Sequence, residues 1–158
     1  MIEDMREYFE YKDGKIFWKK DKGSRGKVGQ RFGSFDGSRY WHGMFNGKMY
    51  REHQLVWALL YGVIPEYIDH VDGNGLNNCI ENLREVTQSQ NMMNSRLRKD
   101  SSTKKKNVTY DAARKKYRVE ITVNGTKKRI GRFDDIELAS LVAEEARDKY
   151  HKQFARSF

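Results

Sequence analysis

The residues best suited to do chemistry lie in the segment 67–91. Asp69 and His70 stand side by side between apolar residues. Asn82 follows His70 by 12 residues, and Asn91 comes 9 residues after Asn82. If the task is phosphodiester hydrolysis, the carboxylate of Asp69 and the amide of Asn91 are hard ligands that suit Mg²⁺ or Mn²⁺. The neutral imidazole of His70 is suited to take a proton from an attacking water.

A strand, a loop and a second strand are expected to position these side chains. A loop rich in Gly and Asn follows the Asp-His pair, and the chain returns to an apolar stretch at 80–86. Thr87 and Gln90 have the spacing of a helix capping box, which predicts a helix that carries Asn91. Because side chains alternate along a strand, Asp69 and His70 serve one phosphate only if their strand is twisted, bulged or edge-on to the substrate. Four polar residues are expected to form the loop itself: Asp72, Asn74, Asn77 and Asn78.

A core helix is expected before this unit. From Arg51 onward, Leu55 and Leu59 recur at helical spacing, and Gly62 stands where a helix would stop. His53 lies at the start of this helix. We favour a buried, hydrogen-bonded structural role for His53 over a catalytic one.

Two hairpins are expected in the first fifty residues. Asp13-Gly14 and Asn46-Gly47 each separate two short apolar stretches and suit a two-residue turn, because both central positions need a positive φ. Between the hairpins, residues 22–38 carry five glycines and four basic side chains, a composition typical of a mobile connection. A solvated loop is the favoured interpretation, and a contact with a DNA backbone is the alternative.

The charge of the chain is concentrated in its second part. The 158 residues carry a formal net charge of +9, while residues 1–95 hold 13 basic and 13 acidic side chains, so residues 96–158 carry the whole excess. Such an excess indicates a polyanionic partner such as nucleic acid. The segment 96–106 is polar and basic, which predicts a linker between two modules.

Composition excludes several classes of protein. A single cysteine cannot form an internal disulfide or a thiolate zinc cluster, and it fits a reducing compartment. The longest apolar run, residues 55–64, is about half as long as a membrane-spanning helix. The first residues lack the pattern of a secretory signal. The sequence therefore predicts a cytoplasmic protein without a membrane span.

Beyond the expected linker, the pattern predicts strands followed by one covering helix. Apolar and polar residues alternate over 116–123, and Asn124-Gly125 then turns the chain into a second strand. Asp134, followed three residues later by Glu137, has the spacing of a helix start.

Residues 51–94 resemble the HNH nucleases with a ββα-metal core, in the branch found in phage and intron-borne homing endonucleases. The shared pattern is Asp-His, then Asp-Gly-Asn, then Glu-Asn-Leu-Arg, then Gln-Asn. The resemblance implies that His70 is the general base and that Asn82 braces the loop between the strands. It also implies that Asp69 and Asn91 bind the metal, Mg²⁺ or Mn²⁺, and that the substrate is double-stranded DNA.

Residues 103–158 resemble a second family, the ethylene-response-factor type of DNA-binding domain, in which a three-stranded sheet packs on one helix. The supporting segments are KKYRVEITVNGTKKRIGRFDD and ELASLVAEEARDKYHKQFA. In that family the sheet lies in the major groove. The resemblance implies that six basic side chains contact DNA: Arg114, Lys116, Arg118, Lys128, Arg129 and Arg132.

Together these patterns predict a two-module α+β protein, a metal-dependent HNH endonuclease. Its parts are a nuclease module at 1–95 with a ββα-metal core at about 51–95, a basic linker at 96–106, and a sheet-and-helix DNA-binding domain at 107–158. The single Asp-His pair and the lack of sustained heptads favour a monomer that nicks one strand, with no protein partner evident. The alternatives are a non-catalytic DNA-binding protein with a decayed nuclease core and, less favoured, an RNA-binding protein.

Overall fold

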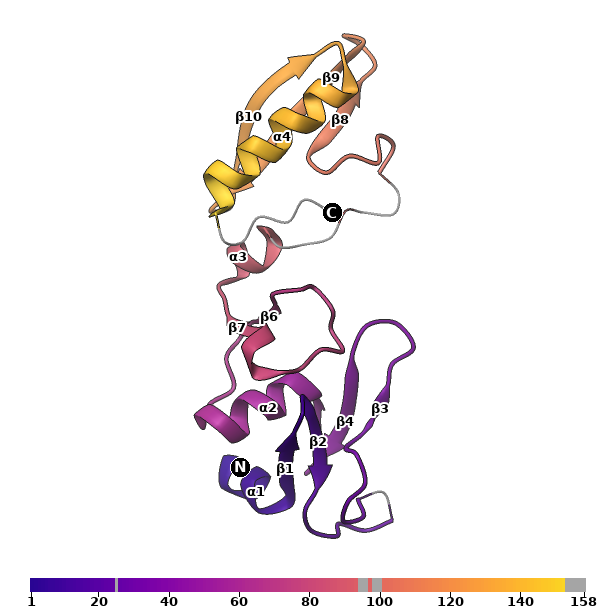
Figure 1. Ribbon diagram of the computed structural model, residues 1–158, viewed down its shortest axis with the longest axis vertical. Coiled ribbons are helices and arrows are strands. Elements are labelled where there is room, and N and C mark those ends of the chain that lie inside the picture. Colours follow the sequence, from indigo (N-terminus) through magenta and orange to yellow (C-terminus); the bar gives the residue numbers. More distant parts are fainter. Residues whose placement is uncertain (25, 94–96, 98–100, 153–158) are drawn as a thin grey trace. The chain divides into compact units, whose positions relative to one another are not determined.

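The protein consists of two compact units, Met1–Glu85 and Val86–Phe158 (Figure 1). The computed structural model describes residues 1–24, 26–93, 97 and 101–152. Both units combine helices with strands, so the expected α+β class is confirmed. Within these described residues, every helix is too short or too polar to cross a bilayer.

The first unit opens with a short helix and two hairpins. Up to residue 51 its elements are α1 (Ile2–Tyr8), β1 (Phe9–Lys12), β2 (Lys15–Trp18), β3 (Ser34–Phe35), β4 (Trp41–Phe45) and β5 (Lys48–Arg51). β1 pairs with β2, and β3, β4 and β5 form a second antiparallel sheet. Both expected turns are confirmed. Asp13 and Gly14 have φ of 48° and 73°, and Asn46 and Gly47 have φ of 49° and 76°, the left-handed backbone that these residue types tolerate best.

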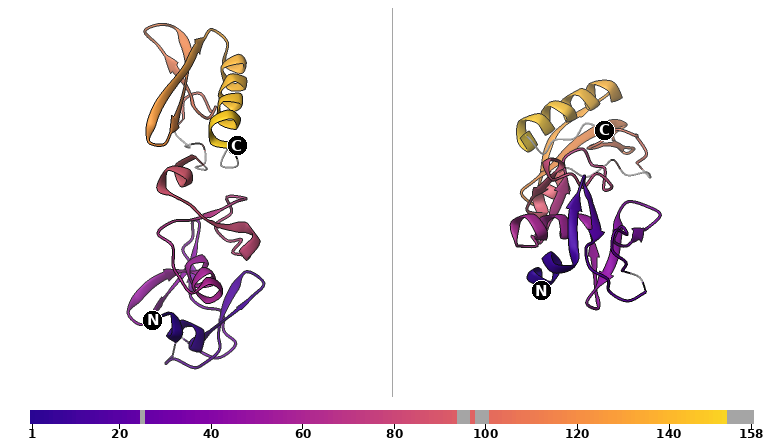
Figure 2. Two further views of the ribbon diagram at one scale, coloured as in Figure 1. Left: turned by 90° about the vertical axis from the view of Figure 1, so that its left-hand side faces the viewer. Right: turned by 60° about the horizontal axis from the view of Figure 1, so that its bottom comes forward.

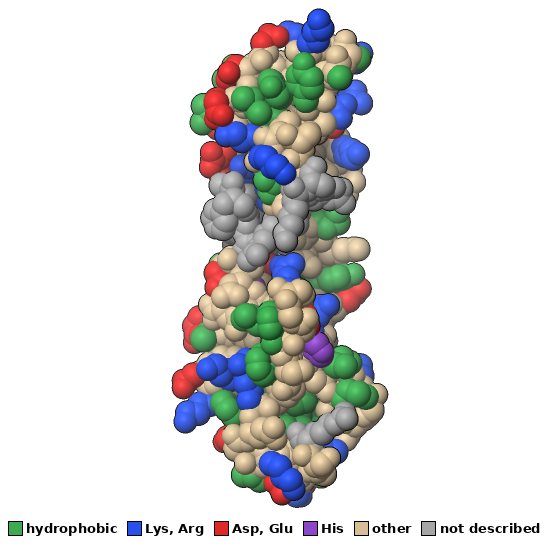
Figure 3. Space-filling model, turned by 90° about the vertical axis from the view of Figure 1, so that its right-hand side faces the viewer, with side chains coloured by type: hydrophobic (Ala, Val, Ile, Leu, Met, Phe, Trp, Pro, Cys, Tyr) green, Lys and Arg blue, Asp and Glu red, His purple; other side chains and the backbone are tan. Residues whose placement is uncertain are grey.

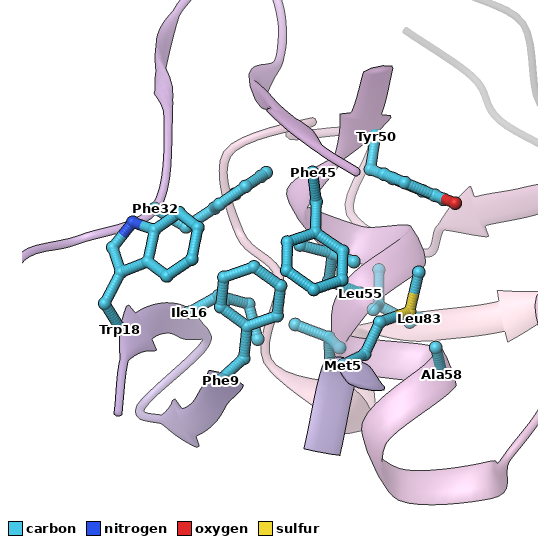
Figure 4. Packing of buried hydrophobic residues seen from close by; sticks show 11 residues of the cluster. Met5, Phe9, Ile16, Trp18, Phe32, Phe45, Tyr50, Leu55, Ala58 and Leu83 are labelled. Carbon is cyan, nitrogen blue, oxygen red and sulfur yellow. The ribbon is translucent and has the colours of Figure 1, made fainter. Parts of the chain in front are cut away.

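Helix α2 (Glu52–Tyr61) contributes to the core of this unit. The Arg51 amide donates to Oε1 of Gln54 at 2.9 Å, and Gly62 ends the helix at a φ of 73°, which confirms the helix expected between Arg51 and Gly62. Figure 4 shows side chains from α1, both hairpins and α2 meeting in one cluster. Its labelled members are Met5, Phe9, Ile16, Trp18, Phe32, Phe45, Tyr50, Leu55, Ala58 and Leu83.

The segment with the Asp-His pair forms a short two-stranded sheet, as expected. β6 (Ile68–His70) pairs antiparallel with β7 (Leu83–Glu85), and the one-turn 3₁₀ helix η1 (Ile80–Asn82) leads into β7. In this register Asp69 lies opposite Arg84, and His70 lies opposite Leu83. Because the Leu83 side chain is buried in the core cluster, the small sheet is anchored to the rest of the unit.

The described residues of the second unit form two helices and one sheet. Its elements are α3 (Gln88–Met93), β8 (Val108–Asp111), β9 (Lys116–Val123), β10 (Thr126–Phe133) and α4 (Ile136–His151). β9 is the central strand of an antiparallel sheet, and α4 lies along one face of that sheet (Figure 2). The expected turn at Asn124 and Gly125 is confirmed by φ values of 49° and 78°. Val119, Ala139 and Ala143 are buried between the sheet and α4.

The sequence predicted the cap of α3 correctly and placed the cap of α4 one residue too early. The Thr87 amide donates to Oε1 of Gln90 at 2.8 Å, and the Gln90 amide donates to Oγ1 of Thr87 at 3.3 Å, so the expected capping box of α3 is confirmed. The expected cap of α4 is wrong by one residue. Asp135 is the N-cap and accepts from the Leu138 amide at 2.7 Å, whereas Asp134 pairs with Lys116. Two adjacent aspartates have the same capping chemistry, so spacing alone did not separate them.

The division between the units lies before α3, whereas the sequence places this helix in the nuclease module, residues 1–95. In the structure α3 packs against β9, and Nζ of Lys106 donates to the carbonyl of Met93 at 3.3 Å. These contacts place α3 in the second unit. Of the expected linker, 96–106, residues 96 and 98–100 lie outside the described residues, and the remainder belongs to this unit.

Candidate active site

Strand β6 places the two central candidates, Asp69 and His70, in buried positions. Their exposed fractions are 6% and 3%. Oδ2 of Asp69 accepts from Nε and Nη2 of Arg84, at 3.0 and 2.8 Å. Nε2 of His70 lies 2.9 Å from Oδ1 of Asn78. The two neighbouring side chains therefore contact different partners, as the alternation of side chains along a strand predicts.

Asn82 holds the loop between the two strands from inside. Its Nδ2 donates to Oδ1 of Asp72 at 2.9 Å and to the carbonyl of Asn77 at 2.8 Å. Its Oδ1 accepts from the Asp72 amide at 3.0 Å. One amide side chain thus joins both ends of the loop, which is the contact pattern expected of a bracing asparagine. Its part in catalysis stays a prediction.

Asn78 differs from the three other polar residues expected to form this loop. Asp72, Asn74 and Asn77 do make hydrogen bonds within it. Asn78 is 1% exposed, and it contacts His70 and, through Nδ2, Oε2 of Glu52 at 2.9 Å. The interpretation of Asn78 as a loop former was therefore incomplete, because burial against α2 gives its amide a second set of partners.

Glu52 was missed by the sequence analysis, although it is fully buried at the start of α2. Its carboxylate pairs with Arg31, and the Arg31 guanidinium also stacks on the Trp41 ring at 3.7 Å from the centroid. A glutamate in the first turn of a helix is a common surface feature, so its position gave no signal. What distinguishes it is burial beside a charged partner, which only the fold reveals.

An aromatic cluster also lies close to the His70 ring. His53 meets His70 edge-on, with ring centroids 5.0 Å apart, and Tyr40 lies 5.5 Å from His53 and 6.1 Å from His70. Arg51 and Arg39 both lie over the Tyr40 ring. The expectation that His53 is buried is confirmed by its 5% exposure. The segment 22–38, expected to be a solvated loop or a DNA contact, includes the short strand β3, and Arg39 and Tyr40 of this cluster follow directly after it.

Both imidazoles of the site are kept neutral. Burial, and then the electrostatic influence of His70, Arg51 and Arg39, lower the pKa of His53 to about 3. The pKa of His70 is also lowered, mainly by burial, against the opposing effects of the Asn78 hydrogen bond and the two nearby aspartates. At neutral pH His70 is therefore in the uncharged form that a general base requires.

The candidate metal ligands lie in different units. Asp69 is on β6 in the first unit, and Asn91 is half-buried on α3 in the second, so their joint role stays a prediction. The described residues contain no group of three His, Cys, Asp or Glu side chains arranged to hold a metal. Magnesium sites do not need such a group, because Mg²⁺ is commonly held by one or two carboxylates, waters and substrate phosphates. The carboxylate and amide donors fit a hard cation of this kind.

The six basic candidates of the second unit do not all share one face. Arg129 lies opposite Glu120, and Arg132 lies opposite Arg118, so these side chains point to the open face of the sheet. Lys128 lies opposite the buried Ile121 and points to the helix side, where its Nζ is 4.1 Å from the Tyr150 ring centroid. Lys116 and Arg118 are two residues apart on β9, and Arg114 lies in the turn before that strand.

Acidic neighbours partly neutralise this basic face. Glu120 pairs with Arg118 and Arg129, both at 3.2 Å. Arg114, Lys116 and Arg132 also have carboxylate partners. Figure 3, a side view, shows Lys and Arg side chains (blue) as well as Asp and Glu side chains (red) on the surface of the protein. Exposed ion pairs of this kind are worth only about 0–1 kcal/mol, so a phosphate can replace the carboxylate at little cost.

Comparison with known proteins places this site within a described family. Residues 50–93 match the HNH endonuclease family. Protein 3.8 of Escherichia phage T7 is 32% identical over 108 residues, which cover 67% of this chain and 88% of that protein. An HNH endonuclease of Acanthamoeba polyphaga mimivirus is 36% identical over 106 residues, 63% of this chain and 54% of that protein, so this chain spans about half the length of the mimivirus relative. No solved structure gives a significant match.

Proposed function

Because the chain belongs to the same family as Protein 3.8 of phage T7 and carries an HNH endonuclease domain at residues 50–93, we propose that it hydrolyses phosphodiester bonds of duplex DNA with His70 as the general base. One observation carries this proposal. A neutral, buried imidazole is held by a hydrogen bond on the strand that also presents Asp69. An ordinary surface Asp-His pair would be solvated and without such a fixed orientation.

The proposed chemistry divides into binding and proton transfer. His70 takes a proton from the water that attacks phosphorus, and the bond to the 3′ oxygen breaks as the new P–O bond forms. The 3′ oxygen leaves with the electron pair of the broken bond and takes a proton from solvent, which gives a 3′-hydroxyl and a 5′-phosphate. Asp69 and Asn91 are the side chains that would hold Mg²⁺ or Mn²⁺, which when bound stabilises charge on the phosphate and on the leaving oxygen. Arg84 keeps the Asp69 side chain in one orientation, and Asn82 keeps the loop in one conformation.

The second unit is proposed to supply most of the DNA affinity, as a domain of the ethylene-response-factor type. Its three-stranded sheet covered by one helix has that architecture, and residues 96–158 carry the entire net charge of +9. Arg118, Arg129 and Arg132 on the open face are the best placed contacts. Lys128, which lies on the helix side, is a weaker candidate than the other five.

One molecule is proposed to nick one strand, since the chain has one Asp-His pair and therefore one hydrolytic centre. The test is incubation of the full chain with a pool of supercoiled plasmids that carry random inserts, with Mg²⁺, with Mn²⁺ or with EDTA. Open circles that accumulate before linear DNA, only with a divalent cation, are the expected result. Linear DNA without an open-circle intermediate would refute nicking. Binding without any cleavage would refute the nuclease and favour a non-catalytic DNA-binding protein.

A further inference from the structure

A chain of buried polar groups runs away from His70 into the protein. Nε2 of His70 contacts Oδ1 of Asn78 at 2.9 Å, and Nδ2 of Asn78 donates to Oε2 of Glu52 at 2.9 Å. All three side chains are at most 3% exposed, so water does not compete for these hydrogen bonds. The order of donors and acceptors along the chain is therefore set by the protein alone.

Glu52, at the far end of this series of hydrogen bonds, determines which group donates and which accepts in each of them. Oε1 of Glu52 accepts from the Ile16 amide and from Nε of Arg31, both at 3.0 Å, and Oε2 accepts from Nη2 of Arg31 at 2.7 Å. Three donors other than Asn78 therefore face the carboxylate, and two of them belong to the charged guanidinium of Arg31. Paired in this way, Glu52 is a carboxylate that can only accept hydrogen bonds.

The ion pair between Glu52 and Arg31 decides the orientation of the Asn78 amide. Only an N–H group can face an acceptor, so the NH₂ of Asn78 must point to Glu52, and its carbonyl oxygen must point to His70. A carbonyl oxygen in turn requires a donor, so Nε2 of His70 must carry the ring proton. In a neutral imidazole the other nitrogen then bears the lone pair.

We infer that Glu52 and Asn78 are positioning residues that lock His70 in the Nε2–H tautomer, so that Nδ1 is the atom that takes the proton from water. The inference rests on the proposed function for its catalytic meaning. The tautomer itself can be tested without any measurement of activity. Arg31 and the Ile16 amide belong to the same arrangement, because they hold the carboxylate that sets its direction.

The tautomer is measured directly by long-range ¹H–¹⁵N NMR correlation on the ¹⁵N-labelled full chain. The chain has four histidines, and the spectrum of His70→Asn identifies the His70 signals by their loss. We expect the protonated nitrogen of His70 to be Nε2 and the unprotonated one, which resonates far downfield, to be Nδ1. A protonated Nδ1 in the wild-type protein would overturn the inference without any variant or activity measurement.

Variants then test the role of the two residues in catalysis. Asn78→Ala removes the acceptor, so we expect a mixture of tautomers and a kcat at least about tenfold lower, within the roughly 10⁴-fold that a wrong tautomer costs in a serine protease. The KM for DNA should not change, because neither residue is proposed to touch DNA. Asn74→Ala is the matched control. The Asn74 side chain accepts from the Leu76 amide in the same loop, and its loss should leave kcat and the His70 signals unchanged.

A double substitution distinguishes a role in positioning His70 from a purely structural role of Asn78 and Glu52. Asn78→Asp alone sets two carboxylates against each other and should abolish most activity. Adding Glu52→Gln restores a donor–acceptor pair, since the new carboxylate at 78 accepts from the new amide at 52 and from Nε2 of His70. We expect kcat to recover above that of Asn78→Asp, with the Nε2–H tautomer present.

The outcomes keep the two proposals apart. An Asn78→Ala protein that is folded and has the wild-type kcat and tautomer would contradict the inference. If the wild-type protein shows the Nε2–H tautomer but no metal-dependent cleavage, the proposed function fails while the structural inference holds. If Asn78→Ala does not fold, the wild-type spectrum and the double variant still decide the question.

Discussion

Replacing His53 with glutamine should make the first unit more resistant to acid. The His53 ring packs against His70 and Tyr40. Burial, followed by the electrostatic influence of His70, Arg51 and Arg39, lowers the pKa of His53 to about 3. In the unfolded chain the same group has a pKa near 6.5. Between these values the unfolded chain binds a proton that the folded protein does not. The stability that depends on neutral His53 is therefore complete above about pH 6.5 and falls as the pH drops toward 3.

The size of the effect follows from the pKa difference. Each pH unit below 6.5 costs about 1.4 kcal/mol of unfolding free energy for one such group. Lowering the pH from 6.5 to 4.5 therefore costs roughly 2 kcal/mol in the wild-type protein, and nothing from this site in His53→Gln.

Tryptophan fluorescence is the appropriate readout, because all three tryptophans, Trp18, Trp41 and Trp57, lie in the first unit. Urea unfolding of the full chain at several pH values between 7 and 4 then gives the free energy of unfolding of that unit. The variant is expected to be less stable than the wild type at pH 7 but to lose less stability as the pH falls. His42→Gln, which changes a half-exposed histidine on β4, should keep the wild-type pH dependence. Parallel curves for the wild type and His53→Gln would refute the reasoning.

Three further predictions concern the β6–β7 loop, the N-terminal cap of α4 and DNA binding. Asn82→Ala removes three hydrogen bonds across the loop and should lower the unfolding free energy by about 2 kcal/mol, with a lower kcat and unchanged DNA affinity; equal urea midpoints would contradict this. Asp135→Ala should destabilise the second unit by about 1 kcal/mol in far-UV circular dichroism melts, whereas Asp134→Ala, which loses only an exposed ion pair, should cost less than about 0.5 kcal/mol. If about six phosphates are neutralised, the logarithm of the DNA-binding constant should fall against the logarithm of salt concentration with a slope near −5, and salt-independent binding would exclude the proposed basic face.

Local features of the fold could be predicted from the sequence where a residue type strongly prefers one backbone conformation or one capping position. The three Asx-Gly turns, the glycine at the end of α2 and the capping box of α3 all lie where their backbone preferences require. The strand–loop–strand unit around Asp69 was also predictable, because apolar stretches on both sides of a polar loop leave few alternatives. The family matched at residues 50–93 agrees with the motif in that unit.

Contacts between distant residues were not predictable in the same way. Glu52 and Asn78 are 26 positions apart, and nothing in either local pattern indicates that they meet. A glutamate at a helix start and an asparagine in a polar loop both have ordinary surface explanations. Their link to His70 depends on how α2 and the β6–β7 loop pack, which is a property of the whole unit.

The basic strand β10 shows how far the direction of each side chain can be predicted from the sequence. Lys128 and Arg129 are adjacent, so in a regular strand they cannot share a face. Arg129 and Arg132 are three residues apart and would also point to opposite faces. The bulge between Arg129 and Gly131 shifts the register by one and brings both arginines to the open face. The alternation was readable from the sequence, but the bulge was not.

The central claim, that His70 is the general base of a DNA hydrolase, is tested most directly by single-turnover cleavage of supercoiled DNA with His70→Ala and Mg²⁺. General-base catalysis is worth roughly 10²–10⁴-fold, so the rate of open-circle formation should fall by that factor. The DNA-binding constant and the tryptophan emission should stay at their wild-type values, since His70 is not proposed to bind DNA. A variant that is folded, binds DNA and cleaves at the wild-type rate would contradict the account.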